Sequence, residues 1–223
     1  MFDLEATFRF FTQYNLSVWP MQIVDYVLSV VILFAAVKKV KYSDQIIAAI
    51  LAFFWIWTAI VFWPPAGVVL PLVPVLAALA FIQGALFLMS IWRPIVSYRF
   101  GTDSFSLTGL ALVAFGLIVY PLIGYSVGHT YPQSLTVGVF PCPTTILTLG
   151  LFLCTAGKVP KYLIVIPGFF AIMLGLSNLY VILGPSGGIV EDIGLLLSGL
   201  VAIPLLIYRD RAAAPTSVLR PAG

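Results

Sequence analysis

The chain has 223 residues, of which 61% are hydrophobic and only 9% are charged, against about 25% charged residues in an ordinary soluble domain. A soluble domain of this size could not bury so much apolar surface. The composition therefore predicts an integral membrane protein whose main partner is the lipid bilayer, and it excludes soluble enzymes, nucleic-acid binders and disordered proteins. The formal charge of +3 does not indicate an acidic partner, because the basic residues stand between apolar runs, where they set orientation.

Seven apolar runs are candidates to cross ~30 Å of hydrocarbon, for which a helix needs about 20 residues. They are Pro20–Val37, Ile46–Trp63, Val68–Trp92, Phe105–Val127, Pro143–Gly157, Tyr162–Leu183 and Gly188–Tyr208. The predicted fold is all-α, a bundle of seven transmembrane helices over residues 20–208. The fifth helix is short, since at 1.5 Å per residue it reaches only about 22 Å.

The two ends of the chain lie outside this bundle. Within residues 1–19, the stretch Leu4–Tyr14 mixes phenylalanines with polar residues and is typical of an amphipathic helix lying in the membrane interface. The tail from Arg209 to Gly223 is rich in alanine and proline, so we expect residues 209–223 to be a disordered cytoplasmic segment.

Basic residues fix the expected orientation. With seven spans, ten of the eleven lysines and arginines fall on one side of the membrane: Lys38, Lys39, Lys41, Arg93, Arg99, Lys158, Lys161, Arg209, Arg211 and Arg220. The other side holds Arg9 alone. The positive-inside rule then places the N-terminus outside and the C-terminus in the cytoplasm. The expected interfacial aromatic anchors are Trp19, Trp63 and Tyr131 outside, and Tyr42, Trp92, Tyr162 and Tyr208 inside.

The segment Gly128–Cys142, ahead of the short fifth helix, carries no lysine, arginine, aspartate or glutamate. We expect it to dip into the outer leaflet among the helices, because irregular backbone at that depth needs protein or a wet cavity around it. The alternative is a surface loop above a thinned bilayer.

Two side chains of this region suggest chemistry. Pro143 suits the first turn of a helix, which places Cys142 at or near the N-cap, where the helix dipole favours a thiolate or a soft-metal ligand. His129 is the only histidine and is a candidate proton carrier or metal ligand. The alternatives are a small buried thiol beside a proline turn and a histidine that holds a loop.

Three acids share the predicted outer side. Asp25 stands inside the first apolar run, where a carboxylate is costly and usually functional. Glu191 and Asp192 open the seventh run and equally suit a helix N-terminus. The amide Asn178 and the hydroxyl Thr144, a candidate helix cap, complete the predicted ligand-binding set. This half of the protein therefore favours cations or protons over anions.

Two further patterns concern packing. Cys142 and Cys154 are expected near opposite membrane faces, so no disulfide joins them. Glycines recur seven residues apart and predict close helix contacts: Gly109 and Gly116, Gly150 and Gly157, Gly168 and Gly175.

Four stretches together resemble a family of small bacterial multi-span proteins of unknown function. They are Tyr14-Asn15 with Trp19-Pro20, Gly128-His129-Thr130-Tyr131-Pro132, Pro141-Cys142-Pro143-Thr144-Thr145-Ile146 and Glu191-Asp192-Ile193-Gly194-Leu195. The resemblance covers nearly the whole chain and implies a bacterial inner (plasma) membrane protein, without an activity or cofactor. The chain departs from the family where Trp63-Pro64-Pro65-Ala66-Gly67 replaces an aromatic-rich Asn-Pro turn.

Three functions remain open from the sequence. The first is a transporter or channel for a cation, a metal ion or a proton-coupled small solute, since half-length helices often line transport sites. The second is a metal-site protein, with His129 and Cys142 as ligands of a divalent or soft metal ion, or an enzyme that uses the same pair. The third is an accessory or scaffold subunit of a membrane complex, or of a homo-oligomer.

Overall fold

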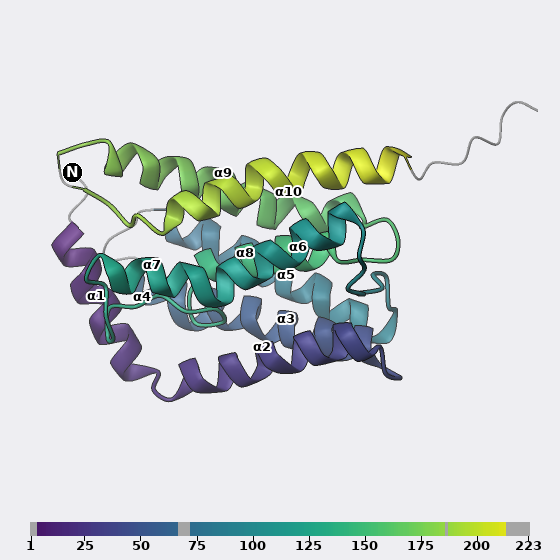
Figure 1. Cartoon of the computed structure of the whole chain (residues 1–223). Helices are drawn as coiled ribbons and strands as arrows, with labels where there is room; N and C mark the ends of the chain where they lie inside the picture. Colours follow the sequence, from purple (N-terminus) through teal and green to yellow (C-terminus); the bar gives the residue numbers. More distant parts are fainter. Residues whose placement is uncertain (1–3, 67–71, 186, 213–223) are drawn as a thin grey trace, which may run out of the picture.

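The computed structural model describes residues 4–66, 72–185 and 187–212, and within these ranges it contains helices and no strand. Figure 1 shows the long helices side by side as a bundle, with α1 (Leu4–Ser17) across one end. The other α-helices are α2 (Met21–Lys38), α3 (Ser43–Trp57), α4 (Trp63–Ala66), α5 (Val73–Trp92), α6 (Ser104–Ala114), α7 (Tyr120–Ser126), α8 (Pro141–Leu153), α9 (Lys161–Ile182) and α10 (Asp192–Ala212). Two π-helical turns, η1 (Thr58–Phe62) and η2 (Phe115–Val119), join α3 to α4 and α6 to α7.

Among the described residues, six helical stretches are long and apolar enough to cross a membrane, as expected of a multi-pass membrane protein. They are Met21–Lys38, Ser43–Ala66, Val73–Trp92, Ser104–Ser126, Lys161–Ile182 and Asp192–Arg211. The predicted fifth span corresponds to α8, whose 13 residues reach only about 20 Å. The start of the predicted third span and the tail beyond Ala212 lie outside the described residues, whereas the helix α10 runs past the expected start of that tail at Arg209.

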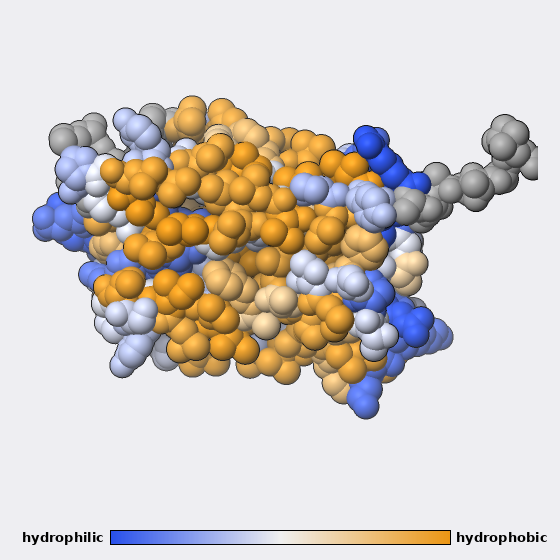
Figure 2. Space-filling model, turned by 45° about the horizontal axis from the view of Figure 1, so that its top comes forward, coloured by the Kyte–Doolittle hydropathy of each residue, from blue (hydrophilic) through white to orange (hydrophobic). Residues whose placement is uncertain are grey.

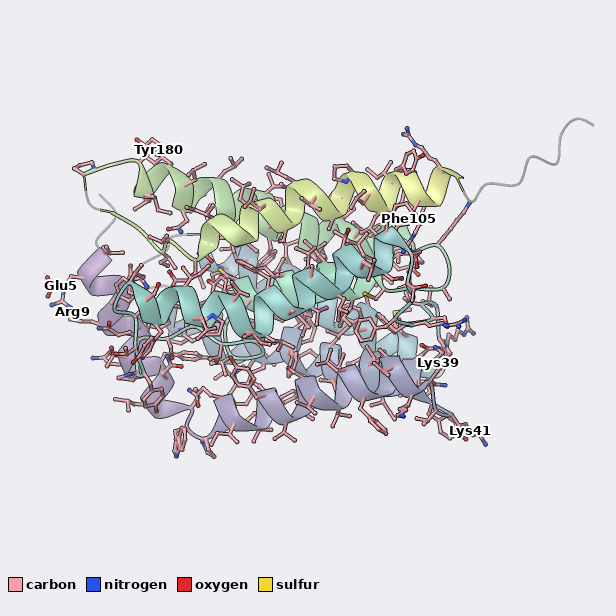
Figure 3. All side chains as sticks on the ribbon, in the orientation of Figure 1. Glu5, Arg9, Lys39, Lys41, Phe105 and Tyr180 are labelled. Atoms are coloured by element: carbon pink, nitrogen blue, oxygen red, sulfur yellow. The ribbon has the colours of Figure 1, made fainter. Side chains whose placement is uncertain are left out.

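The bundle has two chemically different ends. At the end that carries α1, here called the α1 end, Figure 3 labels Glu5 and Arg9, and at the opposite, basic end it labels Lys39 and Lys41. Figure 2 shows apolar residues over the middle of one face and hydrophilic residues toward its ends. This distribution fits a belt of lipid between two polar regions.

Basic side chains tie the loops of the basic end together. The Lys39 Nζ donates to Asp44 Oδ1 at 2.6 Å and to the Tyr98 carbonyl at 3.0 Å. The Arg209 guanidinium donates to the carbonyls of Phe152 and Leu153 at 3.1 and 3.2 Å. Because the last carbonyls of a helix lack partners inside the helix, Arg209 takes over part of the capping of α8.

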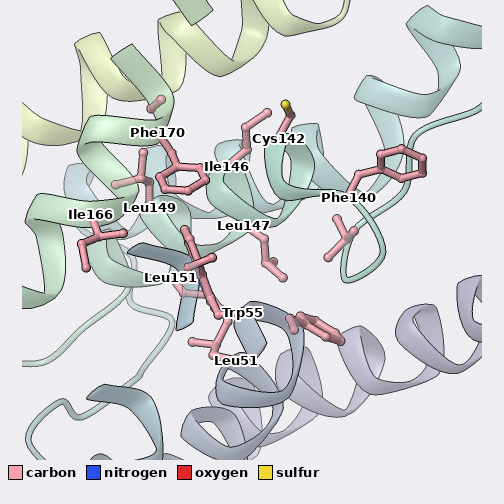
Figure 4. Close-up of a cluster of buried hydrophobic side chains, with 14 of the residues drawn as sticks. Leu51, Trp55, Phe140, Cys142, Ile146, Leu147, Leu149, Leu151, Ile166 and Phe170 are labelled. Carbon is pink, nitrogen blue, oxygen red and sulfur yellow. The ribbon is translucent and has the colours of Figure 1, made fainter. Parts of the chain in front are cut away.

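Helix α8 is the centre of the molecule. All 13 of its residues are buried, and it packs against α3, α6, α9 and α10. Figure 4 shows its side chains among those of the neighbouring helices, with these residues labelled: Leu51, Trp55, Phe140, Cys142, Ile146, Leu147, Leu149, Leu151, Ile166 and Phe170. A helix enclosed by protein need not match the bilayer thickness, which accounts for its short length.

Glycines allow the helices around α8 to approach closely. A Cβ at Gly109 in α6 would lie 2.5 Å from the Gly150 carbonyl oxygen in α8, and one at Gly175 would lie 2.7 Å from Leu196 Cβ in α10. The predicted contacts of the heptad glycines are thus confirmed for these positions, and for Gly116 and Gly168 in weaker form. The prediction is wrong for Gly157, which stands beyond the end of α8 with nothing within 4 Å of its added Cβ.

Prolines explain where the long helices change pitch. Pro121 has no N–H to donate to the carbonyl four residues earlier, and that carbonyl, of Leu117, accepts instead from the Tyr26 hydroxyl at 3.2 Å. Pro64 and Pro65 likewise have no N–H to donate to the carbonyls four residues earlier, which lie in η1. π-Helical turns of this kind are frequent at functional sites, and both lie in the halves of their helices that face the α1 end.

Candidate functional site

A cavity of about 150 Å³ lies inside the α1 end. Its walls are mainly aromatic and aliphatic, with a few polar groups. The lining residues are Thr7, Phe10, Phe11, Phe62, Trp63, Ala66, Leu135, Phe140, Pro141, Cys142, Leu174, Ser177, Asn178, Val181, Ile189 and Asp192. Helix α1 contributes to the wall through its apolar face, since Phe10 and Phe11 are buried against the bundle. Whether α1 also lies in a membrane interface remains a prediction.

The acidic pair at the start of α10 connects this cavity to the rest of the site. Asp192 lines the cavity and is 3% exposed, and Glu191 is 1% exposed. Tyr120 in α7 donates its hydroxyl hydrogen to Asp192 Oδ1 at 2.5 Å, and Cys142 donates from its thiol to Asp192 Oδ2 at 3.5 Å. The pair is therefore more than a surface cap of a helix, because both carboxyl groups are enclosed by protein.

His129 lies on the other side of the acidic pair. Its Nδ1 is 2.8 Å from Glu191 Oε1, and its ring packs against that of Phe8, tilted by 38° with the centroids 4.3 Å apart. His129 also lines a groove of about 450 Å³ beside η2 and α7, together with Tyr26, Tyr125 and Ser134. The two acids thus have separate partners: Glu191 contacts the imidazole of His129, and Asp192 accepts from the Tyr120 phenol and the Cys142 thiol.

A missing side chain makes room for the His129–Glu191 contact. A Cβ added to Gly124 in α7 would lie 2.6 Å from Glu191 Oε1 and 3.6 Å from the Cβ of His129. The Gly124 carbonyl also accepts the His129 backbone N–H at 2.8 Å. Gly124 therefore positions both partners, although nothing in the sequence distinguishes it from a packing glycine.

Asn178 positions the start of α10. Its side-chain amide donates to the Ile189 carbonyl, and its Oδ1 accepts from the Ile189 N–H at 3.2 Å. Both backbone groups belong to the turn immediately ahead of the acidic pair. Asn178 lies at the cavity wall, but its polar atoms already serve the fold.

The start of α8 is built by the segment that precedes it. Residues 135–142 are buried, so the second half of the predicted Gly128–Cys142 segment does run among the helices. The N-cap of α8 is Phe140, with Cys142 in the first turn. Thr144 donates to the Phe140 carbonyl at 2.6 Å and accepts from the Gly138 N–H at 2.8 Å, and its hydroxyl is thereby used in capping.

Residues of α1 hold this segment in place. Asn15 is fully buried and donates to the carbonyls of Pro132 and Ser134 at 2.6 and 2.9 Å. The Tyr14 hydroxyl donates to the Val139 carbonyl at 3.1 Å. Burial raises the pKa of the Tyr14 phenol above its ordinary range, with a smaller contribution from the charge of Asp25, so the hydroxyl stays a neutral donor.

Asp25 stands apart from the other acids. It is fully buried in α2, and neither carboxyl oxygen has a hydrogen-bond partner within the described part of the chain. Its side chain packs directly on Gly138, whose φ of +83° favours glycine. Asp25 is not among the residues that line the cavity, so the structure does not join it to Glu191 and Asp192.

The structure thus brings together His129, Glu191, Asp192 and Cys142 of the predicted set. Within the described ranges, His129 bonds to Glu191 and Cys142 to Asp192. The same ranges contain no group of three or more histidine, cysteine, aspartate or glutamate side chains arranged to hold a metal ion. Cys142 and Cys154 are both free and buried, in line with the predicted absence of a disulfide between them.

Sequence reasoning missed two polar members of the site. Tyr120 stands in an apolar run. Its hydroxyl deep in that run, followed by a proline, was the signal in the sequence that could have identified it as a site residue. The prediction of Trp63 as an interfacial anchor is wrong, because Trp63 is 1% exposed and lines the cavity. At the same end, Trp19 and Tyr131 are about half exposed and pack edge to face on each other, and their role as interfacial anchors stays a prediction.

Comparisons with known proteins give a family and no activity. A family described as "Family of unknown function (DUF6064)" matches residues 4–216. No curated protein and no solved structure matches the chain.

Proposed function

The chain belongs to the DUF6064 family, a family of unknown function, and from its geometry we propose that it is a proton-coupled transporter of a small neutral solute. The solute site is the cavity at the α1 end. One observation carries the proposal: Asp192 lines the cavity, and Glu191, its neighbour in the chain, contacts His129, which lines a separate groove.

The groups between groove and cavity are those that carry protons in proteins. Imidazole and carboxyl groups exchange protons most readily, and the side chain of His129 is 14% exposed while that of Glu191 is 1% exposed. A solute in the cavity displaces water from Asp192, and burial of an ionised carboxylate away from water costs free energy. Solute binding and protonation of Asp192 are therefore thermodynamically linked, and the linkage is reciprocal.

The cavity walls favour a neutral solute over a hydrated ion. Pockets of this kind bind through apolar contact, with a few polar groups setting orientation. Among the three transport substrates that the sequence leaves open, the lining therefore supports the proton-coupled small solute rather than a metal ion or another cation.

Two features of the helices support a transporter. Helix α8 is half-length and begins at the cavity through Phe140, Pro141 and Cys142, and η1 contributes Phe62 to the wall. Interrupted and half-length helices often form the substrate sites of secondary transporters. α8 acts as the seventh membrane-embedded helix of the bundle, in addition to the six long ones.

The charge distribution sets the orientation that we propose. The basic end faces the cytoplasm by the positive-inside rule, so that the α1 end and the cavity lie on the outer side of a bacterial inner membrane. The solute then enters from outside, close to His129.

The test is proton movement that depends on solute. Purified protein is reconstituted into liposomes that contain a pH-sensitive dye, and anisole, benzyl alcohol or cyclohexanone is added outside. These molecules carry no proton when they cross lipid unaided, so a change of internal pH beyond that of protein-free liposomes reports coupled transport. We expect such a change with the wild-type chain and none with Asp192→Asn.

A second acid at the same end provides the control. Glu5 is exposed and pairs with Arg9 across one helical turn, at 3.4 Å, so Glu5→Gln is expected to keep the wild-type response. A wild-type protein that is silent with all three solutes contradicts the proposal, as does an Asp192→Asn response equal to that of wild type.

A further inference from the structure

We propose that the basic end of the bundle binds the headgroup of an anionic phospholipid, on a platform formed by three loops. The platform comprises residues 39–42, 93–103 and 154–160, which connect α2 to α3, α5 to α6 and α8 to α9. The inference concerns the end of the molecule opposite to the cavity, so it goes beyond the proposed transport and does not depend on it.

Two of the three loops are paired through their backbones. The Arg99 N–H donates to the Cys154 carbonyl at 2.8 Å, and the Ala156 N–H donates to the Ser97 carbonyl at 2.9 Å. These bonds form a short antiparallel bridge between the connections that follow α5 and α8. Arg99 and Lys158, which lies two residues beyond Ala156, therefore stand on one structural unit.

Lys39 and Asp44 join the third loop to this unit. The Lys39 Nζ donates to the Ser97 hydroxyl and to the Tyr98 carbonyl, at 3.0 Å each. The Asp44 carboxylate accepts from the same Nζ at 2.6 Å and from the Tyr98 N–H at 2.8 Å. Tyr98 itself is 2% exposed, so the loops are anchored in the protein interior. The platform is therefore preorganised, which reduces the entropy that binding costs.

Four cationic side chains of the platform are left without an anionic partner. They are those of Lys41, Arg93, Arg99 and Lys158, which are exposed and form no ion pair within residues 4–66, 72–185 and 187–212. Lys41 points away from the bundle (Figure 3). Ammonium and guanidinium groups bind phosphate oxygens through charge-assisted hydrogen bonds, so the platform offers a site to a phosphate group.

The acidic side chains near the platform do not balance these charges. Within the described part of the chain, Asp44 and Asp210 are already paired with basic residues. Asp103, the one acid in the three loops, accepts backbone N–H groups at the start of α6. The net charge of the whole chain is only +3, so the attraction for an anion arises because cations are gathered at this place.

Exposed aromatic side chains indicate the depth of the platform in the membrane. Trp92 precedes Arg93 and is 77% exposed, and Tyr42 follows Lys41 and is 57% exposed. Exposed tryptophan and tyrosine at the ends of apolar helices are typical of the headgroup level of a bilayer. Basic residues directly beyond such helices attract anionic lipids, by about fivefold in affinity per charge. An anionic phospholipid therefore fits both the charge and the position of the platform.

The experiment measures lipid binding by native mass spectrometry of the full chain in detergent micelles. Dissociation constants are determined for dioctanoyl-phosphatidylglycerol, which is anionic, and for dioctanoyl-phosphatidylcholine, which has the same acyl chains and no net charge. Glycerol 1-phosphate is the third ligand, and it separates a lipid site from a site for a free phosphate. All three are measured with wild type and with charge-neutralising variants.

The variants remove equal charge from different places. Arg99→Gln/Lys158→Gln removes two of the free cations of the platform, and both positions are exposed. Arg9→Gln/Arg211→Gln is the matched control, since it removes two exposed cations that lie in α1 and α10, outside the three loops. The far-ultraviolet circular dichroism spectrum shows whether each variant is folded.

We expect wild type to bind phosphatidylglycerol about 10-fold or more tightly than phosphatidylcholine, and to bind glycerol 1-phosphate far more weakly than phosphatidylglycerol. Arg99→Gln/Lys158→Gln is expected to lose roughly 10- to 30-fold in affinity for phosphatidylglycerol and the control less than about 3-fold. Raising NaCl from about 50 to 500 mM is expected to weaken phosphatidylglycerol binding to wild type, because salt screens exposed charges.

Three results would overturn the inference: equal affinity of wild type for the two lipids, an unchanged preference in Arg99→Gln/Lys158→Gln, or an equal loss in the control. Glycerol 1-phosphate bound as tightly as phosphatidylglycerol would overturn the assignment to a lipid. Lys41→Gln/Arg93→Gln removes the other two free cations and is expected to give a comparable loss. This second pair decides the question if the first pair does not fold, and an unchanged affinity there would count against the platform.

Discussion

Replacement of Gly109 by alanine is expected to lower the free energy of unfolding by about 3 kcal/mol, the upper range for overpacking a tight contact. The added Cβ would lie 2.5 Å from both the Gly150 carbonyl oxygen and the Cys154 Sγ. The first of these atoms is backbone, so the clash is relieved only if α6 and α8 move apart. Because α8 is the buried centre of the bundle, such a shift disturbs its packing against α3, α9 and α10 as well.

The measurement is unfolding in mixed micelles of a mild detergent and dodecyl sulfate, followed by tryptophan fluorescence. Gly157 is the matched control, because the sequence pattern treats both glycines alike while the structure does not. A Cβ at Gly157 meets nothing within 4 Å, and Gly157→Ala is expected to change stability by less than about 1 kcal/mol. Equal effects of the two substitutions would refute the close approach of α6 to α8.

Replacement of Asn178 by leucine is expected to destabilise the protein by about 2 kcal/mol, since it leaves the buried Ile189 N–H unpaired at roughly 1–3 kcal/mol. It also removes one of the two donors to the Ile189 carbonyl, which still accepts from the Asp192 N–H at 3.0 Å. Leucine has a similar volume, so the effect is not that of a cavity. The turn that Asn178 holds leads directly into Glu191 and Asp192. We therefore expect the variant to lose the anisole-dependent pH change as well, although Asn178 need not touch the solute.

The stability of the Asn178 variant is measured by the same unfolding assay, and its transport in liposomes. Ser177 is the adjacent control, since it also lines the cavity but is exposed and lies outside the hydrogen bonds to Ile189. Ser177→Ala is expected to keep wild-type stability. An Asn178→Leu protein as stable as wild type would show that the turn before α10 does not depend on this side chain.

Much of the helical layout follows from apolar runs alone. The six long helices correspond to predicted spans. The start predicted for the third span, Val68, falls on residues that the structure does not describe, and the other bounds shift by up to four residues. The largest of these other shifts is at α10, which begins at Asp192 rather than Gly188, because Asn178 binds the preceding turn by side-chain contacts that hydrophobicity does not reveal. The tendency of α8 to be short was visible, whereas its place at the centre was not, since a buried and a lipid-facing helix are equally apolar.

The acidic residues and the cysteine of the candidate site could be predicted from the sequence. How these side chains are arranged in space could be predicted only in part. Charged groups in apolar runs are rare enough to attract attention, which singled out Glu191, Asp192 and Asp25. The sequence does not tell which of them meet, and the structure places Asp25 against Gly138 instead of beside the others. Trp63 was misassigned because tryptophan near the end of an apolar run is typical of an interface, and the aromatic cover provided by α1 was not foreseeable from periodicity.

The central claim is that filling the cavity and protonating Asp192 are one linked event. It is tested most directly by calorimetry of anisole binding in two buffers of equal pH and different ionisation enthalpy, where the difference in observed heat counts the protons taken up. The account predicts net proton uptake by the wild-type protein and none by Asp192→Asn. Equal heats in both buffers for wild type, with anisole bound, would contradict it.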